Sequence, residues 1–233
     1  DFGMQSALLD VFAYNQSMSK LSDTINDNLS TYHSEYVMTS FLDNHDVPRF
    51  LHEAGNDVNQ LKLAATAQFA LPGSPVIYYG TEVGLSQSKD HHSYSDWKDR
   101  WYREMKPWNK ADQDLELKAY YQDLINLRVN QPALSIGSYK ELYSDSHVLV
   151  FERKHKNKTF IVAINNGSNA KKLPITLEKK NHGLQNALDR TNGIHSDRNG
   201  KVELNLGSRS AEIYEVVAPG KIISEQKKKE KTS

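Results

Sequence analysis

Two short apolar runs, each ending abruptly in polar or turn residues, constrain the fold of this chain more than any other feature. The run 37–42 stops at the Asp-Asn-His-Asp sequence of 43–46, and the run 75–79 stops at Gly80. Between them, 59–71 carries apolar residues at helical spacing. Continuous apolar strands that alternate with helices are typical of a parallel sheet covered by helices. The pattern therefore predicts a strand–helix–strand unit.

The same alternation extends to both sides of this unit. Asn59 is the expected N-cap of the first helix, and Pro72-Gly73 is its expected stop. Residues 1–4 are interpreted as the end of an earlier strand, with a helix beginning at 6–12, and 115–129 predicts a further helix with one broad apolar face. Three βα units are thus visible, whereas a closed (β/α)₈ barrel takes about 250 residues. If the fold is such a barrel, most of it lies outside this chain.

From Leu134 onward the pattern changes to short alternating runs separated by turn signals such as Asn199-Gly200. This texture predicts an antiparallel β-sandwich. The expected strands cover 139–143, 147–153, 159–164, 173–177, 202–206 and 211–217. We therefore expect residues 1–133 to form barrel units, 134–219 to form the sandwich and 220–233 to form a disordered lysine-rich tail.

Composition excludes several classes of function. Lys plus Arg and Asp plus Glu number 29 each, so the charge balance predicts neither a nucleic-acid partner nor an acidic lipid surface. The chain has no cysteine, which excludes disulfides and thiolate metal sites. No apolar run reaches the ~18 residues of a membrane span. An uncharged substrate fits this balance.

The Asp-Asn-His-Asp sequence of 43–46 is the densest group of reactive side chains at a strand end. In parallel α/β folds, functional residues gather in the loops after the carboxyl ends of strands. Pattern alone leaves two interpretations open, a site that binds hydroxyl groups or a polar loop that caps the next helix. The His–Asp pair is weak evidence for a metal site, and we predict none.

The residues around both strand ends resemble the alpha-amylase family of glycoside hydrolases. Residues 41–46 match the F-x-x-N-H-D signature that ends the seventh barrel strand of the family, and Arg49 also suits it. Residues 73–84 match the eighth-strand pattern G-x-P-x-I-Y-Y-G-x-E-x-G. The segment 103–108 loosely resembles an R-x-P-M-x-W motif, but its Pro is displaced and we assign it no function. The region from Leu134 resembles the family's C-terminal domain.

The resemblance implies roles for individual residues. Asp46 maps onto the carboxylate that binds sugar hydroxyls at the cleavage point and stabilises the transition state. His45 resembles the histidine that hydrogen-bonds the same sugar, and Asn44 and Arg49 are expected to bind substrate. We reject Asp43 and Glu82 as substitutes for the nucleophile and general acid, which the family takes from its fourth and fifth strands.

Aromatic residues follow the second strand end. Trp97 and Trp101 are candidate platforms for stacking on sugar rings, and the alternative is that they pack the barrel against the sandwich. A metal site at His91-His92 is a weaker alternative, because adjacent side chains rarely converge on one ion.

The resemblance implies that the longer parent protein hydrolyses α-1,4-glucosidic bonds of starch-like α-glucans with retention, as an alpha-amylase. The chain begins Asp-Phe-Gly-Met, which we interpret as a cut inside a longer protein. Without nucleophile and acid it is expected to be inactive alone, with the N-terminal part of the barrel as its missing partner. No cofactor is expected here, and any calcium would be held upstream. We expect secretion of a bacterial type, with a cytoplasmic location left open. The alternatives are a non-catalytic carbohydrate-binding module, a transglycosylase or an α-1,6-acting relative.

Overall fold

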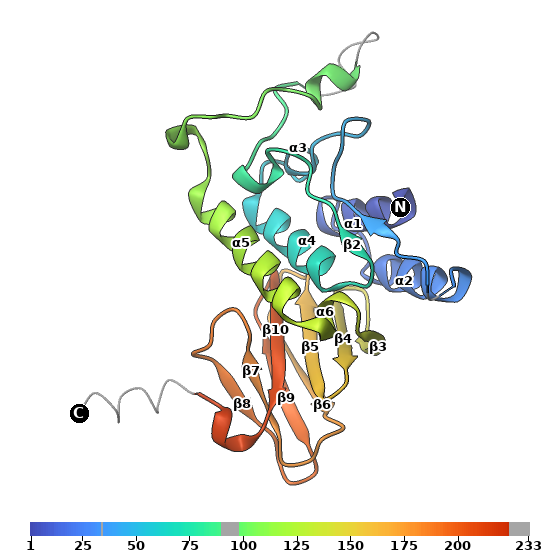
Figure 1. The fold of residues 1–233 in the computed structure, drawn as a ribbon, viewed down its shortest axis with the longest axis vertical. Coiled ribbons are helices and arrows are strands. Elements are labelled where there is room, and N and C mark those ends of the chain that lie inside the picture. Colours follow the sequence, from blue (N-terminus) through green and yellow to red (C-terminus); the bar gives the residue numbers. More distant parts are fainter. Residues whose placement is uncertain (34, 90–97, 224–233) are drawn as a thin grey trace, which may run out of the picture.

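The computed structural model describes residues 1–33, 35–89 and 98–223. Helices occupy one end of the molecule and an antiparallel sheet the other (Figure 1). The helical end contains α1 Phe2–Phe12, α2 Ser19–Thr31, β1 Thr39–Ser40, α3 Phe50–Glu53, α4 Val58–Ala70, β2 Ser74–Pro75, η1 Thr81–Val83, η3 Lys98–Trp101, η4 Lys110–Asp112, α5 Leu115–Asn130 and α6 Pro132–Ser135. The sheet end contains β3 Ser138–Ser144, β4 Val148–His155, β5 Lys158–Asn165, β6 Lys171–Thr176, β7 Gly183–Asn186, β8 Gly193–His195, β9 Lys201–Leu206, β10 Ser210–Val217 and the turn η5 Pro219–Lys221.

The helix boundaries correct two predictions. Asp1 is the N-cap of α1, because its carboxylate accepts a hydrogen bond from Met4 N at 3.0 Å, so 1–4 begins a helix rather than ending a strand. Asp57, not Asn59, caps α4, since Asn59 N donates to its carboxylate at 2.9 Å. Asp and Asn side chains are both suited to the N-cap position. Here the backbone amide of Asn59 is the donor to Asp57, so Asp57 takes that position. The predicted helix at 115–129 is confirmed as α5, whereas α2 was not predicted.

The two predicted parallel strands pair over a short stretch. Thr39 lies beside Ser74 and Ser40 beside Pro75, while Ser74 N donates to Met38 O at 3.0 Å and Val76 N to Ser40 O at 2.8 Å. Among the described residues neither strand has a second neighbour. Val37 is 68% exposed and Val76 48% exposed. Apolar residues left exposed next to unpaired strand edges are expected to be covered by further strands.

The sheet end consists of two layers. The larger sheet has the order β3-β4-β5-β10-β7-β8, and β6 pairs with β9 to form the second layer. The six predicted strands are confirmed, while β7 and β8 were missed because the segment that contains them alternates weakly. β4 shows why the sheet is buried on both faces. Leu149 and Phe151 pack with the helices, whereas Val148 and Val150 pack against β6 and β9. The predicted tail falls mainly on residues 224–233, outside the described residues.

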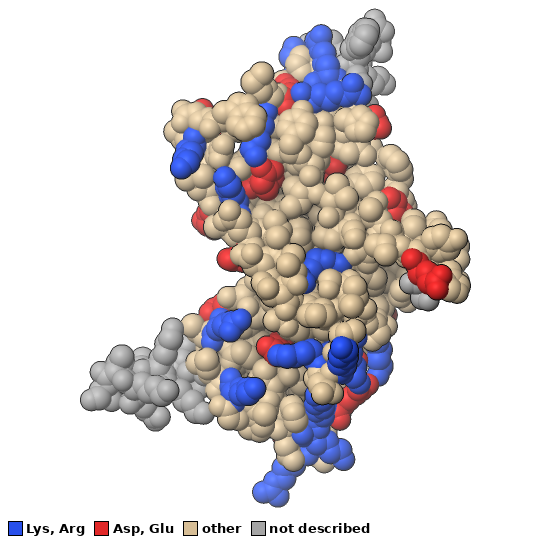
Figure 2. Space-filling model, in the orientation of Figure 1, with Lys and Arg blue, Asp and Glu red and all other residues tan. Residues whose placement is uncertain are grey.

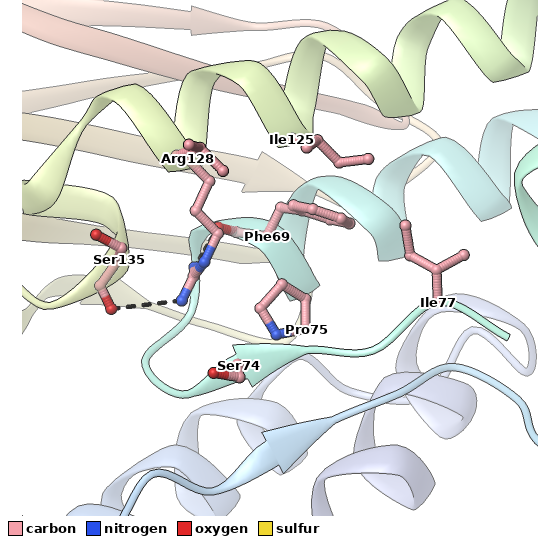
Figure 3. Close-up of a pocket in the computed structure, with 8 residues that line it drawn as sticks. Phe69, Ser74, Pro75, Ile77, Ile125, Arg128 and Ser135 are labelled. Carbon is pink, nitrogen blue, oxygen red and sulfur yellow. Dashed lines mark hydrogen bonds between the residues drawn. The ribbon is translucent and has the colours of Figure 1, made fainter.

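Two buried arginines join the helical end to the sheet. Arg128 of α5 donates to Phe69 O and Leu71 O. Its guanidinium also reaches Ser135 O (Figure 3). Arg153 of β4 donates to Ala70 O at the end of α4, and to Ser138 O and Gly137 O. The last carbonyls of a helix lack intrahelical partners and carry partial negative charge. The two guanidinium groups therefore satisfy the C-terminus of α4 and fix it against the sheet.

A charged cluster closes the turn between β3 and β4. The carboxylate of Asp145 accepts hydrogen bonds from the amides of His147 and Val148 at 2.8 Å each, and from Tyr143 Oη at 2.7 Å, and it pairs with Lys171. Burial raises the pKa of Asp145, but the hydrogen bonds from Lys171, His147, Tyr143 and Val148 outweigh burial. The net effect holds the pKa well below its ordinary value of 3.8.

This lowered pKa predicts a pH-dependent contribution to stability. A carboxyl group with a depressed pKa in the folded state stabilises the fold above its unfolded-state pKa, and that contribution is lost as the pH falls. Asp145→Asn should therefore lower the free energy of unfolding near neutral pH by about 1 kcal/mol. The difference from wild type should shrink as the pH falls below the ordinary value of 3.8. Urea denaturation at a series of pH values measures it, with exposed Asp123→Asn as control. A difference that stays constant across the series would contradict the assignment.

Candidate functional site

The loop after β1 is shaped by Asn44. Asp46 N donates to Asn44 Oδ1 at 2.7 Å, and Val47 N donates to the same oxygen at 3.1 Å. Such an Asx turn fixes the backbone locally. His45 and Asp46 are exposed, and Asn44 is half-buried. The carbonyl oxygen of Asn44 thus holds the loop, and the two residues that follow are presented to solvent at the carboxyl end of the strand.

The Asp46 carboxylate lies between two basic groups. His45 Nε2 is 3.2 Å from Asp46 Oδ2, and Arg103 Nη2 is 3.8 Å from Asp46 Oδ1. Arg103 Nε also donates to His45 O at 3.2 Å. About half of the carboxylate side chain stays exposed, at 55%. An accessible carboxylate beside an imidazole can accept hydrogen bonds from ligand hydroxyls and stabilise a developing positive charge.

Neighbouring carboxylates are committed to other contacts. Asp43 is buried, and accepts hydrogen bonds from Thr81 Oγ1 at 2.7 Å and Phe50 N at 3.1 Å. Burial raises its pKa, and this effect outweighs the opposing effects of Arg49 and of the two hydrogen bonds. Glu82 accepts from Gly80 N at 2.8 Å and pairs with Lys106. Asp43 therefore links the loop after β1 to the loop after β2. Both Asp43 and Glu82 are engaged in these structural contacts.

Arg49 differs from the prediction. We expected it to bind substrate, yet it is fully buried, with Nη1 donating to Tyr79 O at 2.8 Å. Its guanidinium carbon lies 4.1 Å from the centre of the Tyr78 ring and 4.8 Å from that of Tyr79. The stacking of the Arg49 guanidinium on these rings attaches the loop after β1 to the residues that follow β2. Since no part of Arg49 is accessible, it is removed from the proposed substrate-binding set.

The predicted aromatic platforms have different outcomes. Trp97 lies outside the described residues. Trp101 is partly exposed at the end of η3, where Lys89 Nζ lies 5.0 Å and the Arg100 guanidinium 4.2 Å from the ring centre. Cations over the ring occupy surface that a sugar would otherwise contact. The role of Trp101 in substrate binding therefore stays a prediction.

In the parts of the chain that the structure describes, no three His, Asp or Glu side chains converge to hold a metal ion. None of the described helices has the length and apolar character needed to cross a membrane.

Two cavities lie away from Asp46. One of about 380 Å³ beside β2 is lined by Phe69, Pro75 and Ile125 among others (Figure 3). A second of about 650 Å³ lies near α2 and β3, and Asp46 lines neither cavity. Figure 2 shows that the middle of one face is largely uncharged, with Lys and Arg gathered toward both ends.

Two family models match the chain. Residues 3–126 match the model described as the alpha amylase catalytic domain, and residues 137–214 match the alpha-amylase C-terminal domain. The first match lies in the helical end of the molecule and includes the Asp46 loop. The second match lies in the sheet end.

Comparison with individual proteins agrees with these matches. A cyclomaltodextrinase from Thermoanaerobacter pseudethanolicus is 32% identical over 171 residues, which is 72% of this chain and 28% of that protein. A cyclomaltodextrin glucanotransferase from Niallia circulans is 32% identical over 168 residues, or 71% of this chain and 21% of that protein. The crystal structure of an Anoxybacillus alpha-amylase superposes with a TM-score of 0.81 at 30% identity, covering 94% of this chain and 46% of that one. The chain thus spans less than a third of the length of these two curated relatives.

Proposed function

Because the chain belongs to the alpha-amylase family of glycoside hydrolases, we propose that it is the C-terminal portion of an enzyme that hydrolyses α-1,4-glucosidic bonds of starch-like glucans with retention. The fold class is that of the family, the last units of a TIM barrel followed by a C-terminal sheet domain. The single observation that carries the proposal is the exposed Asp46 carboxylate, held beside His45 at the carboxyl end of β1.

The proposed mechanism gives each accessible residue of the loop a role. Asp46 accepts hydrogen bonds from hydroxyls of the sugar at the cleavage point and stabilises the positive charge that develops as the bond breaks. His45 donates to the same sugar, and Asn44 keeps both side chains in place through its bonds to Asp46 N and Val47 N. Contacts that strengthen in the transition state are the ones that accelerate the reaction.

The nucleophile and the general acid are proposed to come from the upstream part of the protein. A retaining glycosidase places its two carboxyl groups about 5 Å apart. Asp43 is buried and Glu82 is paired with Lys106, so neither is suited to either task. The open sides of β1 and β2 are where upstream strands would pair. Secretion and a calcium ion bound by upstream residues stay predictions from the family resemblance.

The test compares this chain with the longer protein on maltooligosaccharides. The chain alone should release no reducing sugar, because it supplies only the stabilising carboxylate. The longer protein should release sugars whose new reducing ends are first formed as the α-anomer, as retention requires. Proton NMR of the fresh products reads the anomer directly. Hydrolysis by the chain alone, or β-anomers from the longer protein, would contradict the proposal.

A transglycosylase is the second candidate, because the glucanotransferase relative is as similar to this chain as the cyclomaltodextrinase is. Both reactions form the same glycosyl-enzyme intermediate and differ in whether water or a sugar hydroxyl accepts the glycosyl group. The same assay discriminates them. Longer or cyclic glucans among the products support transfer, whereas shorter linear products alone support hydrolysis.

A further inference from the structure

The segment 103–108 is fastened across the loops that follow β1 and β2. Glu104 Oε2 accepts a hydrogen bond from Ser88 N at 3.0 Å, which links two residues that lie 16 positions apart in the chain. Tyr79 Oη donates to Glu104 O at 3.1 Å, and Lys106 pairs with Glu82. These contacts attach the segment at residues 104 and 106, directly after Arg103 and on both sides of Met105, so the fold restricts the position of the Arg103 backbone.

From this anchored position Arg103 contacts both residues of the proposed site. Its Nε donates to His45 O at 3.2 Å, and its Nη2 lies 3.8 Å from Asp46 Oδ1. The opposite carboxylate oxygen of Asp46 faces His45 Nε2 at 3.2 Å. The guanidinium therefore holds the backbone of one residue and one carboxylate oxygen of the next.

The Asx turn made by Asn44 fixes the backbone of the loop but does not reach the Asp46 side chain. A carboxylate that is about half exposed has several accessible rotamers unless a neighbour restricts it. An arginine offers a planar set of donors that suits two acceptors at once, which a lysine does not.

We infer that Arg103 is a positioning residue, which holds the His45–Asp46 loop and orients the Asp46 carboxylate for the transition state. The inference rests on the function proposed above. Arg103 is 48% exposed, and an exposed ion pair contributes little to folding stability. Its effect is therefore expected in kcat rather than in the melting temperature.

The test uses Arg103→Ala in the longer protein, with Arg198→Ala in the exposed turn before β9 as the matched control. A misplacement of about 1 Å in a reacting group costs about 10²-fold in rate, so kcat of Arg103→Ala should fall about tenfold to a hundredfold. KM should change much less, and the melting temperature should match that of Arg198→Ala. Arg103→Lys, which keeps the charge but replaces the two separated donor nitrogens by one, should recover only part of kcat.

A coupling measurement separates positioning from a general structural effect. If Arg103 acts through Asp46, Arg103→Ala should add little further loss in an Asp46→Asn background. Equal losses in both backgrounds, or a kcat of Arg103→Ala equal to that of Arg198→Ala, would overturn the inference while leaving the proposed function intact. Near-normal turnover of Asp46→Asn alone would instead overturn the proposed function.

Discussion

Asp46→Asn in the longer protein should lower kcat by about 10²- to 10³-fold, the loss that follows removal of one preorganised stabilising group. Asn has nearly the same shape as Asp but carries no charge. It can therefore still occupy the loop, and can still form one hydrogen bond to a sugar hydroxyl. What it loses is the electrostatic stabilisation of a cationic transition state, and this loss appears in kcat rather than in KM.

The fold should be unaffected by this substitution. The Asp46 side chain is 55% exposed, and its contacts with His45 and Arg103 are at the surface. Surface substitutions of this kind change the free energy of unfolding by about 0.5 kcal/mol or less. The loop itself is held by Asn44 Oδ1, which bonds the backbone amide of residue 46 whatever its side chain.

Initial rates on maltooligosaccharides, together with a thermal melt, check this prediction. Asp23→Asn, in the exposed part of α2, makes the same change of charge away from the site and serves as the control. Turnover of Asp46→Asn within a few-fold of the control would sink the assignment of Asp46. A large fall in melting temperature would show instead that the carboxylate supports the fold.

The second large effect is expected at Arg153, which is 1% exposed. Its guanidinium donates to three carbonyl oxygens, those of Ala70, Gly137 and Ser138. Burial, and then the nearby charge of Arg128, lower the pKa of Arg153 to about 9. The group therefore stays protonated at neutral pH, and its positive charge is balanced by carbonyl dipoles, including one at the C-terminus of α4.

Arg153→Met should lower the free energy of unfolding by about 3 kcal/mol. Methionine fills most of the volume but removes all three hydrogen bonds, and each buried carbonyl oxygen that loses its donor costs about 1 kcal/mol or more. Arg153→Lys should recover only a part, because one ammonium group does not reach all three oxygens. The loss of stability should weaken the contact between α4 and the sheet rather than the pairing of strands within the sheet.

Denaturant unfolding of the longer protein measures this effect, and limited proteolysis near Gly137 locates it. Arg198→Met, in an exposed turn, is the matched control for removing an arginine. A stability within about 0.5 kcal/mol of that control would contradict the proposed attachment of α4 to the sheet. Arg128→Met should act in the same direction, since Arg128 bonds the neighbouring carbonyls of Phe69 and Leu71.

Much of the fold was predictable because its signals are local. The alternation of apolar residues along β4 and β5 predicts two strands, and the structure places them in register from Val148 opposite Asn165 onward. The helical spacing after Leu115 predicts α5. The prediction of secondary structure failed in short polar segments, where the residues alone do not distinguish helix, strand and loop. Asp1 caps a helix because its carboxylate accepts from Met4 N, and β7 pairs with β10, which follows it by more than 20 residues in the chain.

The candidate site divides in the same way. The sequence by itself determined the family and placed Asp46 and His45 at the carboxyl end of a strand, because a signature is contiguous and its residues share one loop. Only the tertiary structure decided which polar side chains stay accessible. It buries Asp43 and Arg49, and it brings Arg103 to His45 across 58 positions of the chain and Arg153 to Ala70 across 83. Contacts between residues so far apart in the chain depend on how whole helices and strands pack, and a local sequence pattern does not encode that packing.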